Sequence, residues 1–419
     1  MRKKIGKKNT GIAILFSTII AYAYPLFFAI FSILGIQRPA WGLPIYAVTL
    51  LFGALLLYFR NIYCDYFKIR NKEGILFLFL LFVFFSYFLV YIKHGINIIA
   101  SDTMKDFLVR SIPAILIAIV ASKNNYIKEV SRLINLILIV FTVCSSKIIC
   151  VSILKGYSSN NWEMIFNYDY QSASYMAAYT VGIALYKLCI ERNSKFIYKI
   201  MYIYTIISSS LLSIYSGGRG GVVLCIVYFV LLCLYYVFIE KKAIKLMSFL
   251  FIIMIIFLFY FNNLMENSQL LSGFTRAFEF IGDNGINWEG TSGRKNIYQN
   301  CLEIISKHPI FGYGITGAPY NGIERAHNII LDILIDGGIV YLIIWGIIWW
   351  IFLKRTLIRI KLHPEYALLV VIFVGDFIML FFSGVYMRTA AMWFSVTYIF
   401  VERKYCYKKR LKNEYFNVN

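Results

Sequence analysis

The stretch GILFLFLLFVFFSYFLVYI, residues 74–92, decides the class of this protein, because its nineteen residues include no charge. A helix needs about 20 mainly apolar residues to cross the ~30 Å hydrocarbon core of a bilayer. The whole chain of 419 residues follows the same trend, with 60% hydrophobic and only 15% charged residues. Soluble domains contain about 25% charged residues. The composition therefore excludes an ordinary cytosolic enzyme, a disordered chain and a small disulfide scaffold.

Comparable apolar runs predict an all-α polytopic integral membrane protein with about 12 transmembrane helices and one large extracytoplasmic loop. The first run is too long for a cleaved signal, and no small-x-small site follows it. The predicted spans are residues 11–34, 41–59, 74–92, 107–121, 133–154, 173–190, 196–215, 221–239, 243–261, 329–352, 366–383 and 389–401.

The basic residues predict the orientation of these spans. The net charge is +21, and 29 of the 42 Lys and Arg residues fall in the N-terminal segment, the C-terminal segment and every second loop between them. The opposite side carries 12, and Lys147 lies inside a span. Because short cytoplasmic loops collect Lys and Arg, both termini are expected in the cytoplasm. This explanation of the charge removes the reason to expect a nucleic-acid partner.

The spans divide the chain into three parts. Residues 1–261 form an N-terminal transmembrane bundle of about nine spans, and residues 329–419 contain the C-terminal spans and a basic cytoplasmic tail. Residues 262–328 form the large extracytoplasmic loop. Long loops in compact proteins are functional or disordered. Within this loop, residues 293–307 predict a helix that Ser292 caps, with Ile297, Cys301, Ile304 and Ile305 on one face.

Neither the cysteines nor the histidines predict a metal or disulfide site. There are eight Cys and four His, with no C-x-x-C pair and no spacing typical of metal ligands. Only Cys301 falls in an extracytoplasmic segment. We therefore expect no structural disulfide, no bound metal and no cofactor.

Several arginines lie on the predicted outer side, against the positive-inside rule. Arg219 sits in the tight connection SGGRGG, residues 216–221, whose glycines would allow a ligand close to the backbone. A guanidinium group offers a planar fork of donors that matches phosphate oxygens. The alternative is that such residues only anchor a turn at head-group depth, which for Arg276, Arg325 and Arg388 is the favoured interpretation. The outer arginines considered are Arg219, Arg276, Arg294, Arg325 and Arg388.

A second group of polar residues follows the run HPIFGYG, residues 308–314. It lies in AHNIILDILIDGG, residues 326–338, where the loop meets the tenth predicted span. His327 titrates near neutrality and can move a proton or donate to a phosphate. Asn328 fits a helix cap or a hydroxyl ligand, and Asp332 and Asp336 share one helical face. Carboxylates inside a span face a cavity or a partner, so we expect these two to support the site, although pairing with Arg inside the bundle is an alternative.

Residues 291–315, TSGRKNIYQNCLEIISKHPIFGYGI, and residues 326–343, AHNIILDILIDGGIVYLI, resemble the signature region of the O-antigen polymerase and O-antigen ligase family. The family shows an Arg-Gly pair near the outer end of a span, here Arg219 and Gly220. A Gly-Arg pair then opens a loop helix, a Pro-aliphatic-Phe-Gly-x-Gly run follows, and a His-Asn pair begins a span containing an acid and glycine. Two departures are Gly218 where the family often has Ser, and Asp336 where it more often has Glu.

This resemblance implies an inverting, metal-independent glycosyltransferase with a fold related to the GT-C class. It would act at the outer face of the bacterial cytoplasmic membrane on undecaprenyl-diphosphate-linked oligosaccharides. His327, Arg219 and Arg294 are then the expected catalytic residues. His327 is expected either to orient the phosphate or to deprotonate the acceptor. The expected diphosphate and glycan ligands are Arg219, Gly220, Arg276, Arg294, Arg325, Asn328 and Arg388.

Three functions remain open from the sequence. A polymerase joins lipid-linked repeat units into O-antigen, capsule or another exopolysaccharide, and we favour it because polymerases are more numerous and more divergent. A ligase transfers the glycan to lipid A core in lipopolysaccharide biosynthesis. A flippase or transporter for lipid-linked glycans would also have twelve spans, but the chain shows neither an internal repeat nor broken helices near mid-membrane. Membrane lipid, a chain-length regulator and a flippase of the same pathway are the further expected partners.

Overall fold

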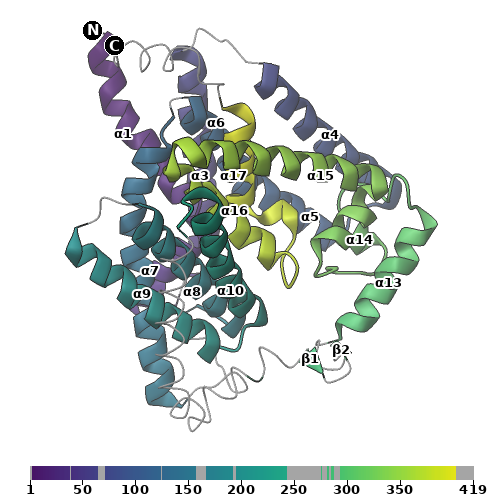
Figure 1. Cartoon of the computed structure of the whole chain (residues 1–419). Coiled ribbons are helices and arrows are strands. Elements are labelled where there is room, and N and C mark those ends of the chain that lie inside the picture. The colour runs from purple at the N-terminus through teal and green to yellow at the C-terminus, as the bar shows by residue number, and fades with distance from the viewer. Residues whose placement is uncertain are drawn as a thin grey trace.

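The computed structural model describes residues 2–37, 39–64, 71–123, 125–156, 167–191, 195–242 and 293–402, together with residues 275, 281–282 and 285–286. Apart from one short pair of strands, the regular structure over these residues is helical (Figure 1). The strands β1 (Ile281–Gly282) and β2 (Gly285–Ile286) are antiparallel. The predicted span 243–261 lies outside the described residues.

The N-terminal helices are α1 (Arg2–Ile20), α2 (Ala23–Leu34), α3 (Gly42–Cys64) and α4 (Asn71–His94). A bend of 84° separates α1 from α2, so the first predicted span is either broken or re-entrant. The expectation of a chain without broken helices is therefore wrong for this span. α5 (Ile98–Asp106), the π-helix η1 (Phe107–Ser111) and α6 (Ile112–Lys123) then follow without interruption.

The middle of the chain forms four long helical segments. These are α7 (Ile127–Lys155), α8 (Tyr170–Leu185), α9 (Phe196–Tyr215) and α10 (Arg219–Leu234). Two of them end in one turn of π-helix, which is η2 (Tyr186–Ile190) after α8 and η3 (Tyr235–Ile239) after α10.

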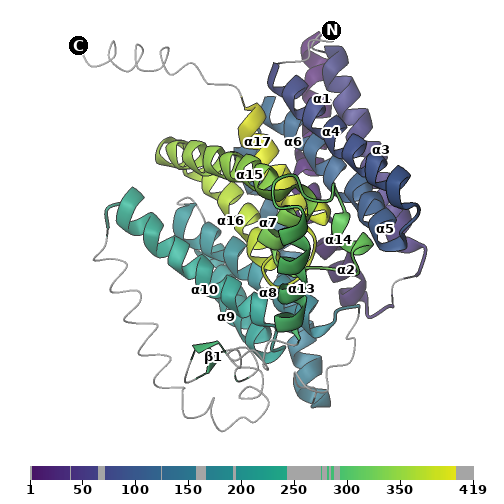
Figure 2. The ribbon, with the colours of Figure 1, turned by 90° about the vertical axis from the view of Figure 1, so that its right-hand side faces the viewer.

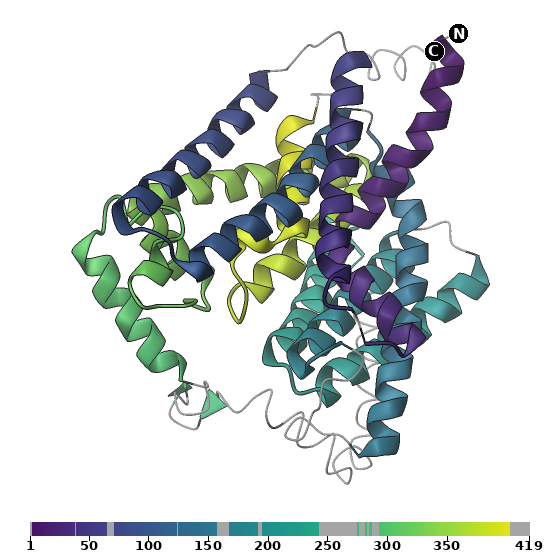
Figure 3. The ribbon, with the colours of Figure 1, turned by 180° about the vertical axis from the view of Figure 1, so that it is seen from behind.

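The last part of the chain contains α13 (Arg294–Lys307), α14 (Gly317–Tyr320), α15 (Ile329–Leu362), α16 (Ala367–Met379) and α17 (Ala390–Val401). Two short 3₁₀ helices join the last three, η5 (Pro364–Tyr366) and η6 (Tyr386–Arg388). α13 lies at one edge of the molecule, outside the bundle and next to α14 and α15 (Figures 1 and 3).

The C-terminal helices join two groups of earlier helices. α17 packs against α6, whereas α16 packs against α8 and α10. Figure 2 shows α15, α16 and α17 between the helices α1, α3, α4 and α6 on one side and α8, α9 and α10 on the other. Buried Asp376 ties this junction together, because it accepts hydrogen bonds from the Tyr179 hydroxyl and from the backbone N–H of Met392.

Seven described helices are long and apolar enough to cross a membrane, and the broken pair α1 and α2 raises the number to as many as eight. The protein is thus a helical polytopic membrane protein. Three other predicted spans correspond to shorter regular helices, namely α6, α16 and α17. The expected number of about 12 therefore stays a prediction, as does the relation to the GT-C class. Among the described residues, Cys144, Cys150, Cys225, Cys233 and Cys301 form no disulfide.

The helix α15 is interrupted at Gly337 and Gly338, and the loop before it fills the interruption. Gly338 has φ 62° and ψ −160°, a conformation essentially restricted to glycine. The carbonyl oxygens of residues 335 and 336 accept hydrogen bonds from the N–H groups of Tyr313 and Gly314, at 2.8 Å each. The N–H groups of residues 339 and 340 donate to the carbonyls of Pro309 and Ile310, at 2.9 and 3.3 Å.

This pairing explains why the two glycine-containing motifs occur together. A helix break inside a membrane leaves backbone groups without partners, and such groups are costly there. The HPIFGYG run supplies the missing donors and acceptors. The close approach also requires small residues, because a Cβ on Gly312 would lie 2.6 Å from the backbone nitrogen of Gly337.

Candidate functional site

Four helices begin at one cavity of about 160 Å³, which we name the arginine cavity. α8 begins there with Tyr170, α10 with Arg219 and α13 with Arg294, and His327 lies two residues before the start of α15. The described residues that line it are Tyr170, Gln171, Tyr175, Gly217, Gly218, Arg219, Gly220, Arg294, Ile297, His327 and Phe382.

The electrostatics of the arginine cavity favour an anion. Two guanidinium groups lie in its wall, and none of the described lining residues is acidic. A helix N-terminus carries a partial positive charge and leaves N–H groups without intrahelical partners. The caps of α10 and α13 are the glycines Gly218 and Gly293, which have no side chain that could satisfy those groups. Such convergent helix ends are typical of phosphate-binding sites.

Arg294 is held in place from two sides. Its Nη2 donates to the backbone carbonyl oxygen of Phe382 at 2.7 Å, and its guanidinium carbon lies 5.7 Å from the centre of the Phe382 ring. The helix α13 presents Arg294 as its first residue because Gly293 ends the preceding loop with φ 78°. Gly293 rather than Ser292 is therefore the cap, and Ser292 itself lies outside the described residues. The predicted apolar face of α13 is confirmed, with Cys301 and Ile304 buried.

The glycines around Arg219 serve helix packing as well as the cavity. A Cβ on Gly218 would lie 2.4 Å from the Cβ of Ser174, and one on Gly220 would lie 1.9 Å from the hydroxyl oxygen of Tyr175. α8 and α10 could not approach so closely with larger residues. The space beside these glycines is therefore filled by α8, although Gly220 still contributes to the cavity wall.

His327 separates the arginine cavity from a second one. The second cavity, of about 400 Å³, shares Ile297 and His327 with the first. His327 takes the left-handed conformation, with φ 53°, and the Tyr298 hydroxyl donates to its carbonyl oxygen at 3.5 Å. The described lining of the second cavity is Ile297, Asn300, Gly322, Ile323, Glu324, Arg325 and His327.

The surroundings of His327 favour the neutral imidazole. Burial lowers its pKa below the ordinary value of histidine, and the charges of Arg294 and Arg325 lower it further. The backbone of Phe382 and the carboxylate of Glu324 oppose this shift only in part. The Nδ1 atom is buried and has no hydrogen-bond partner among the described residues. A neutral imidazole with a free lone pair is suited to accept a proton.

The two carboxylates on α15 hold the loop rather than line either cavity. Asp336 accepts hydrogen bonds from the N–H of Gly317 at 3.1 Å and from the Tyr386 hydroxyl at 2.7 Å. Asp332 accepts one from the N–H of Ala326 at 3.4 Å. The side chain of Asn328 caps α15 by accepting from the N–H of Ile330 at 2.9 Å. These three residues thus position the segment that carries His327.

The structure does not bring every predicted ligand to the arginine cavity. Arg325 lines the second cavity, where it lies 3.7 Å from Glu324. Arg388 lines neither cavity, since its Nε lies 3.2 Å from Asp106 and its Nη2 donates to Thr103 at 3.0 Å. Arg276 lies outside the described residues. The assignment of all three as ligands stays a prediction.

Four lining residues had not been predicted from the sequence, namely Tyr170, Gln171, Tyr175 and Phe382. The first three open α8, whose start Asp169 caps by accepting from the N–H of Ser172 at 2.7 Å. In the sequence, Asp169 was the feature that could have indicated a helix start with polar residues at this point. The place of Phe382 in the cavity could not be predicted from the sequence, because it depends on where α16 ends relative to α13.

In the described part of the chain, no three His, Cys, Asp or Glu side chains are grouped closely enough to hold a metal ion. Metal-independent transfer therefore stays a prediction that rests on the arginines.

Comparison with known proteins found one similarity, and it covers this region. Residues 204–346 match the family model described as O-antigen ligase. This range contains Arg219, Arg294 and His327, and it ends within α15. No curated protein matches the chain.

Proposed function

Because this chain carries a domain of the O-antigen polymerase and ligase family, we propose that it polymerises lipid-linked oligosaccharide repeat units. The donor would be a glycan on undecaprenyl diphosphate, and the product an O-antigen or capsular polysaccharide. The observation that supports this most directly is the arginine cavity, where two guanidinium groups and several helix N-termini converge without a described acidic neighbour.

The proposed reaction is a direct displacement at the anomeric carbon of the donor. The acceptor hydroxyl oxygen forms a bond to that carbon, and the bond to the diphosphate oxygen breaks with its electron pair leaving on the diphosphate. Arg219 and Arg294 stabilise the charge that develops there, which is the main catalytic device for such a step. The acceptor proton passes to neutral His327, which lies between the two cavities.

The arrangement also suggests where the two substrates bind. The diphosphate of the donor occupies the arginine cavity, and the acceptor sugar approaches through the second cavity. The protein would lie in the bacterial cytoplasmic membrane with both termini in the cytoplasm, which puts both cavities on the outer side. A flippase must then deliver the substrate, and a chain-length regulator is a further proposed partner.

Purified protein with one lipid-linked repeat unit and no lipid A core tests this proposal. A ladder of longer lipid-linked products is expected. Transfer only after lipid A core is added would instead establish the ligase function, which the description of the matching family favours. No covalent product under either condition would contradict enzymatic transfer and favour a transporter.

Arg294→Ala tests the arginine cavity within the same assay. We expect a loss of product of about 100-fold or more, because electrostatic stabilisation of this kind is worth several kcal/mol. Arg219→Ala and His327→Ala should behave similarly, with all variants retained in the membrane. Lys307→Ala is the matched control, since it removes a positive charge from the opposite end of α13. Normal polymer from Arg294→Ala would contradict the proposed site.

A further inference from the structure

A buried tyrosine in the wall of the arginine cavity has a hydroxyl group without a partner. Tyr175 lies in the second turn of α8, and 8% of its surface is exposed. It lines the cavity together with Arg219, Arg294 and His327. Its hydroxyl makes no hydrogen bond to any described residue. Buried tyrosine hydroxyls usually find a partner, so this one needs an explanation.

The hydroxyl oxygen of Tyr175 differs from other unpartnered hydroxyls of the described chain in being accessible. The hydroxyl oxygens of Tyr22 and Tyr58 also lack partners, but both are enclosed within the bundle. The oxygen of Tyr175 is not enclosed in this way, and the cavity lies beside it. The unused hydrogen-bonding capacity of Tyr175 is therefore available to a ligand in the cavity.

The packing of α8 on α10 fixes the position of this hydroxyl. A Cβ on Gly220 would lie 1.9 Å from the hydroxyl oxygen of Tyr175, so the hydroxyl rests directly against the backbone of Gly220. Gly220 is the second residue of α10 and itself lines the cavity. The phenol therefore ends beside the first turn of α10, next to the residue that follows Arg219.

The backbone at this point adds another donor. The first hydrogen bonds at the start of α10 are made by the N–H groups of Gly221 and Val222, which donate to the carbonyl oxygen of Gly218 at 3.0 and 3.2 Å. The N–H of Gly220 makes no backbone hydrogen bond to a described residue. A hydroxyl, a peptide N–H and the partial positive charge of the helix end thus meet at one place in the cavity wall.

The chemistry of a phenol in this setting is that of a neutral donor. A tyrosine hydroxyl keeps its proton at neutral pH and can donate one hydrogen bond. No carboxylate among the described lining residues competes for that hydrogen. An anion that enters the cavity would therefore supply the acceptor that Tyr175 lacks.

We propose that the Tyr175 hydroxyl is a further catalytic group, which donates a hydrogen bond to the diphosphate oxygen that leaves the anomeric carbon. This inference rests on the proposed function. The hydroxyl keeps its proton throughout the step, while the electron pair of the broken bond passes to the diphosphate and the acceptor proton passes to His327. A fixed donor of this kind contributes most where negative charge develops.

Tyr175→Phe removes only the hydroxyl and keeps the ring that packs against Gly220. We expect kcat for ladder formation to fall about tenfold to 100-fold, because a hydrogen bond to a charged group is lost. The KM for the donor should change much less, since the bond strengthens as charge develops in the transition state. Initial rates over a range of donor concentrations measure both constants.

A second measurement does not depend on transfer. Purified protein is incubated with undecaprenyl diphosphate, which already carries the charge that develops during the step, and the bound lipid is quantified by native mass spectrometry. Tyr175→Phe should retain severalfold less of this lipid than the wild type. Undecaprenol, which has the same chain without phosphate, should be retained equally by both proteins.

Tyr202→Phe is the matched control. Tyr202 is a buried tyrosine of α9 whose hydroxyl donates to Asn135 at 3.1 Å, and it does not line the arginine cavity. Its variant should keep the kcat and the lipid retention of the wild type. Thermal unfolding in detergent checks both variants. Because the Tyr175 hydroxyl makes no hydrogen bond to a described residue, the midpoint of Tyr175→Phe should equal that of the wild type.

Several outcomes would overturn the proposal. Wild-type kcat in Tyr175→Phe, or an equal loss in Tyr202→Phe, would show that the hydroxyl takes no part in transfer. A lower unfolding midpoint for Tyr175→Phe than for Tyr202→Phe would assign the hydroxyl to stability. Equal losses of undecaprenol and undecaprenyl diphosphate would assign Tyr175 to the lipid chain.

Failure of the proposed function would look different. A wild-type protein that forms no product, yet retains undecaprenyl diphosphate through the Tyr175 hydroxyl, would refute transfer and leave this contact in place. A wild-type ladder that persists in Tyr175→Phe at full rate would refute the contact and leave transfer in place.

Discussion

His327 shows how one backbone conformation and two charges set the chemistry of a side chain. Its left-handed φ follows from the turn that joins the loop to α15, where Asn328 takes over as the cap. The turn directs the ring between the two cavities and near Arg294 and Arg325. Those charges, added to burial, keep the imidazole neutral at a pH where an exposed histidine would begin to gain a proton.

The pH dependence of transfer follows from this lowered pKa. If neutral His327 accepts the proton, activity is lost as the pH falls through a midpoint below the ordinary pKa of histidine. Arg325→Gln removes one of the charges that lower the pKa, so the midpoint should move to higher pH. Initial rates of ladder formation measured between acid and neutral pH check this. An unchanged midpoint in Arg325→Gln would exclude His327 as the titrating group.

Arg219 is expected to need its planar fork as well as its charge. Arg219→Lys keeps the charge but supplies a single rotating ammonium group, which cannot bind a diphosphate in bidentate fashion. We expect transfer to fall about tenfold or more relative to the wild type, with a smaller loss than in Arg219→Ala. Rates under saturating donor measure the effect. A fully active Arg219→Lys enzyme would show that charge alone suffices.

At the scale of single elements, the interrupted helix α15 and the loop before it depend on each other. The four hydrogen bonds between residues 309–314 and 335–340 form only when both are in place. Asp336 also stabilises the loop, because it accepts hydrogen bonds from the N–H of Gly317 and from the Tyr386 hydroxyl. Together these contacts hold the loop that ends at His327.

Gly338→Ala tests that dependence. A Cβ there would lie 2.3 Å from the backbone of Ile310, and the backbone conformation is unfavourable for any residue but glycine. We expect a loss of stability of about 1–3 kcal/mol from the backbone alone, seen as a lower midpoint of thermal unfolding in detergent.

Gly346→Ala is the control on the same helix. No atom lies within 4 Å of the added Cβ, and alanine is favoured over glycine inside a helix by about 0.5–1 kcal/mol. Its unfolding midpoint should stay the same or rise. A Gly338→Ala protein as stable as the Gly346→Ala protein would show that the loop does not need the break.

The sequence predicted some of these elements well and others poorly. Long uncharged runs such as residues 74–92 identify α4 directly, and the 3.6-residue period identifies α13. The kink in α15 was not predicted, because two adjacent glycines do not reveal that an upstream loop supplies hydrogen bonds. Arg219, Arg294 and His327 were found through their motifs, whereas Phe382 and Tyr175 belong to the cavity only through tertiary packing.

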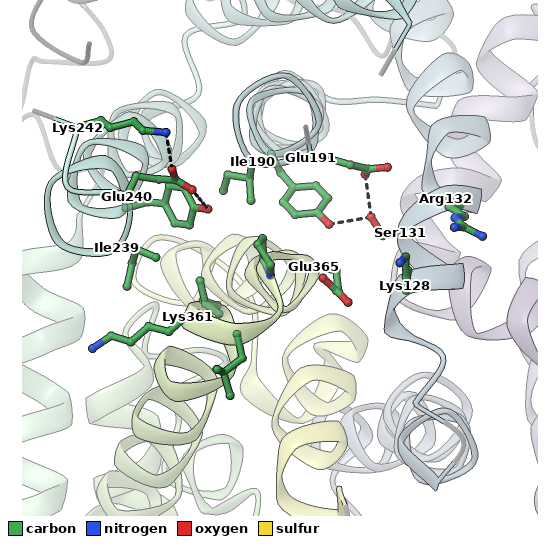
Figure 4. A pocket seen from close by; sticks show the side chains of 15 residues that line it. Lys128, Ser131, Arg132, Ile190, Glu191, Ile239, Glu240, Lys242, Lys361 and Glu365 are labelled. Atoms are coloured by element: carbon green, nitrogen blue, oxygen red, sulfur yellow. Dashed lines mark hydrogen bonds and ion pairs between the residues drawn. The ribbon is translucent and has the colours of Figure 1, made fainter. Parts of the chain in front are cut away.

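At the scale of the whole molecule, two cavities lie at opposite ends of shared helices. The starts of α8, α10 and α13 line the arginine cavity, and the ends of η2, η3 and α15 line a larger cavity of about 560 Å³ (Figure 4). The predicted orientation assigns the first to the outer side and the second to the cytoplasm. Both assignments can be measured directly.

Cysteine labelling measures this sidedness. In a background where the eight native cysteines are serine, Glu324→Cys and Lys361→Cys each place one thiol at an exposed position. A membrane-impermeant maleimide should label Glu324→Cys in spheroplasts. Lys361→Cys should react only after permeabilisation. Labelling of both positions from the same side would contradict the orientation.

In the protein with its native cysteines, Cys301 should not react with the maleimide. Cys301 is fully buried against α15, and burial raises the pKa of its thiol to about 12, with Asp332 adding to the shift. A thiol in that state is rarely deprotonated and reacts slowly. Its lack of labelling would therefore carry no information about sidedness.

The pairing of the α15 break with the loop before it limits how this chain can be recombined with relatives. A chimera that took residues 309–314 from one relative and residues 335–340 from another would need both halves of a backbone ladder to match. Mismatched halves would strand peptide groups in hydrocarbon, where no water can replace them. Specificity swaps between relatives should therefore succeed when the crossover points lie outside residues 309–340. They should fail when a crossover point lies between the two paired segments, residues 309–314 and 335–340.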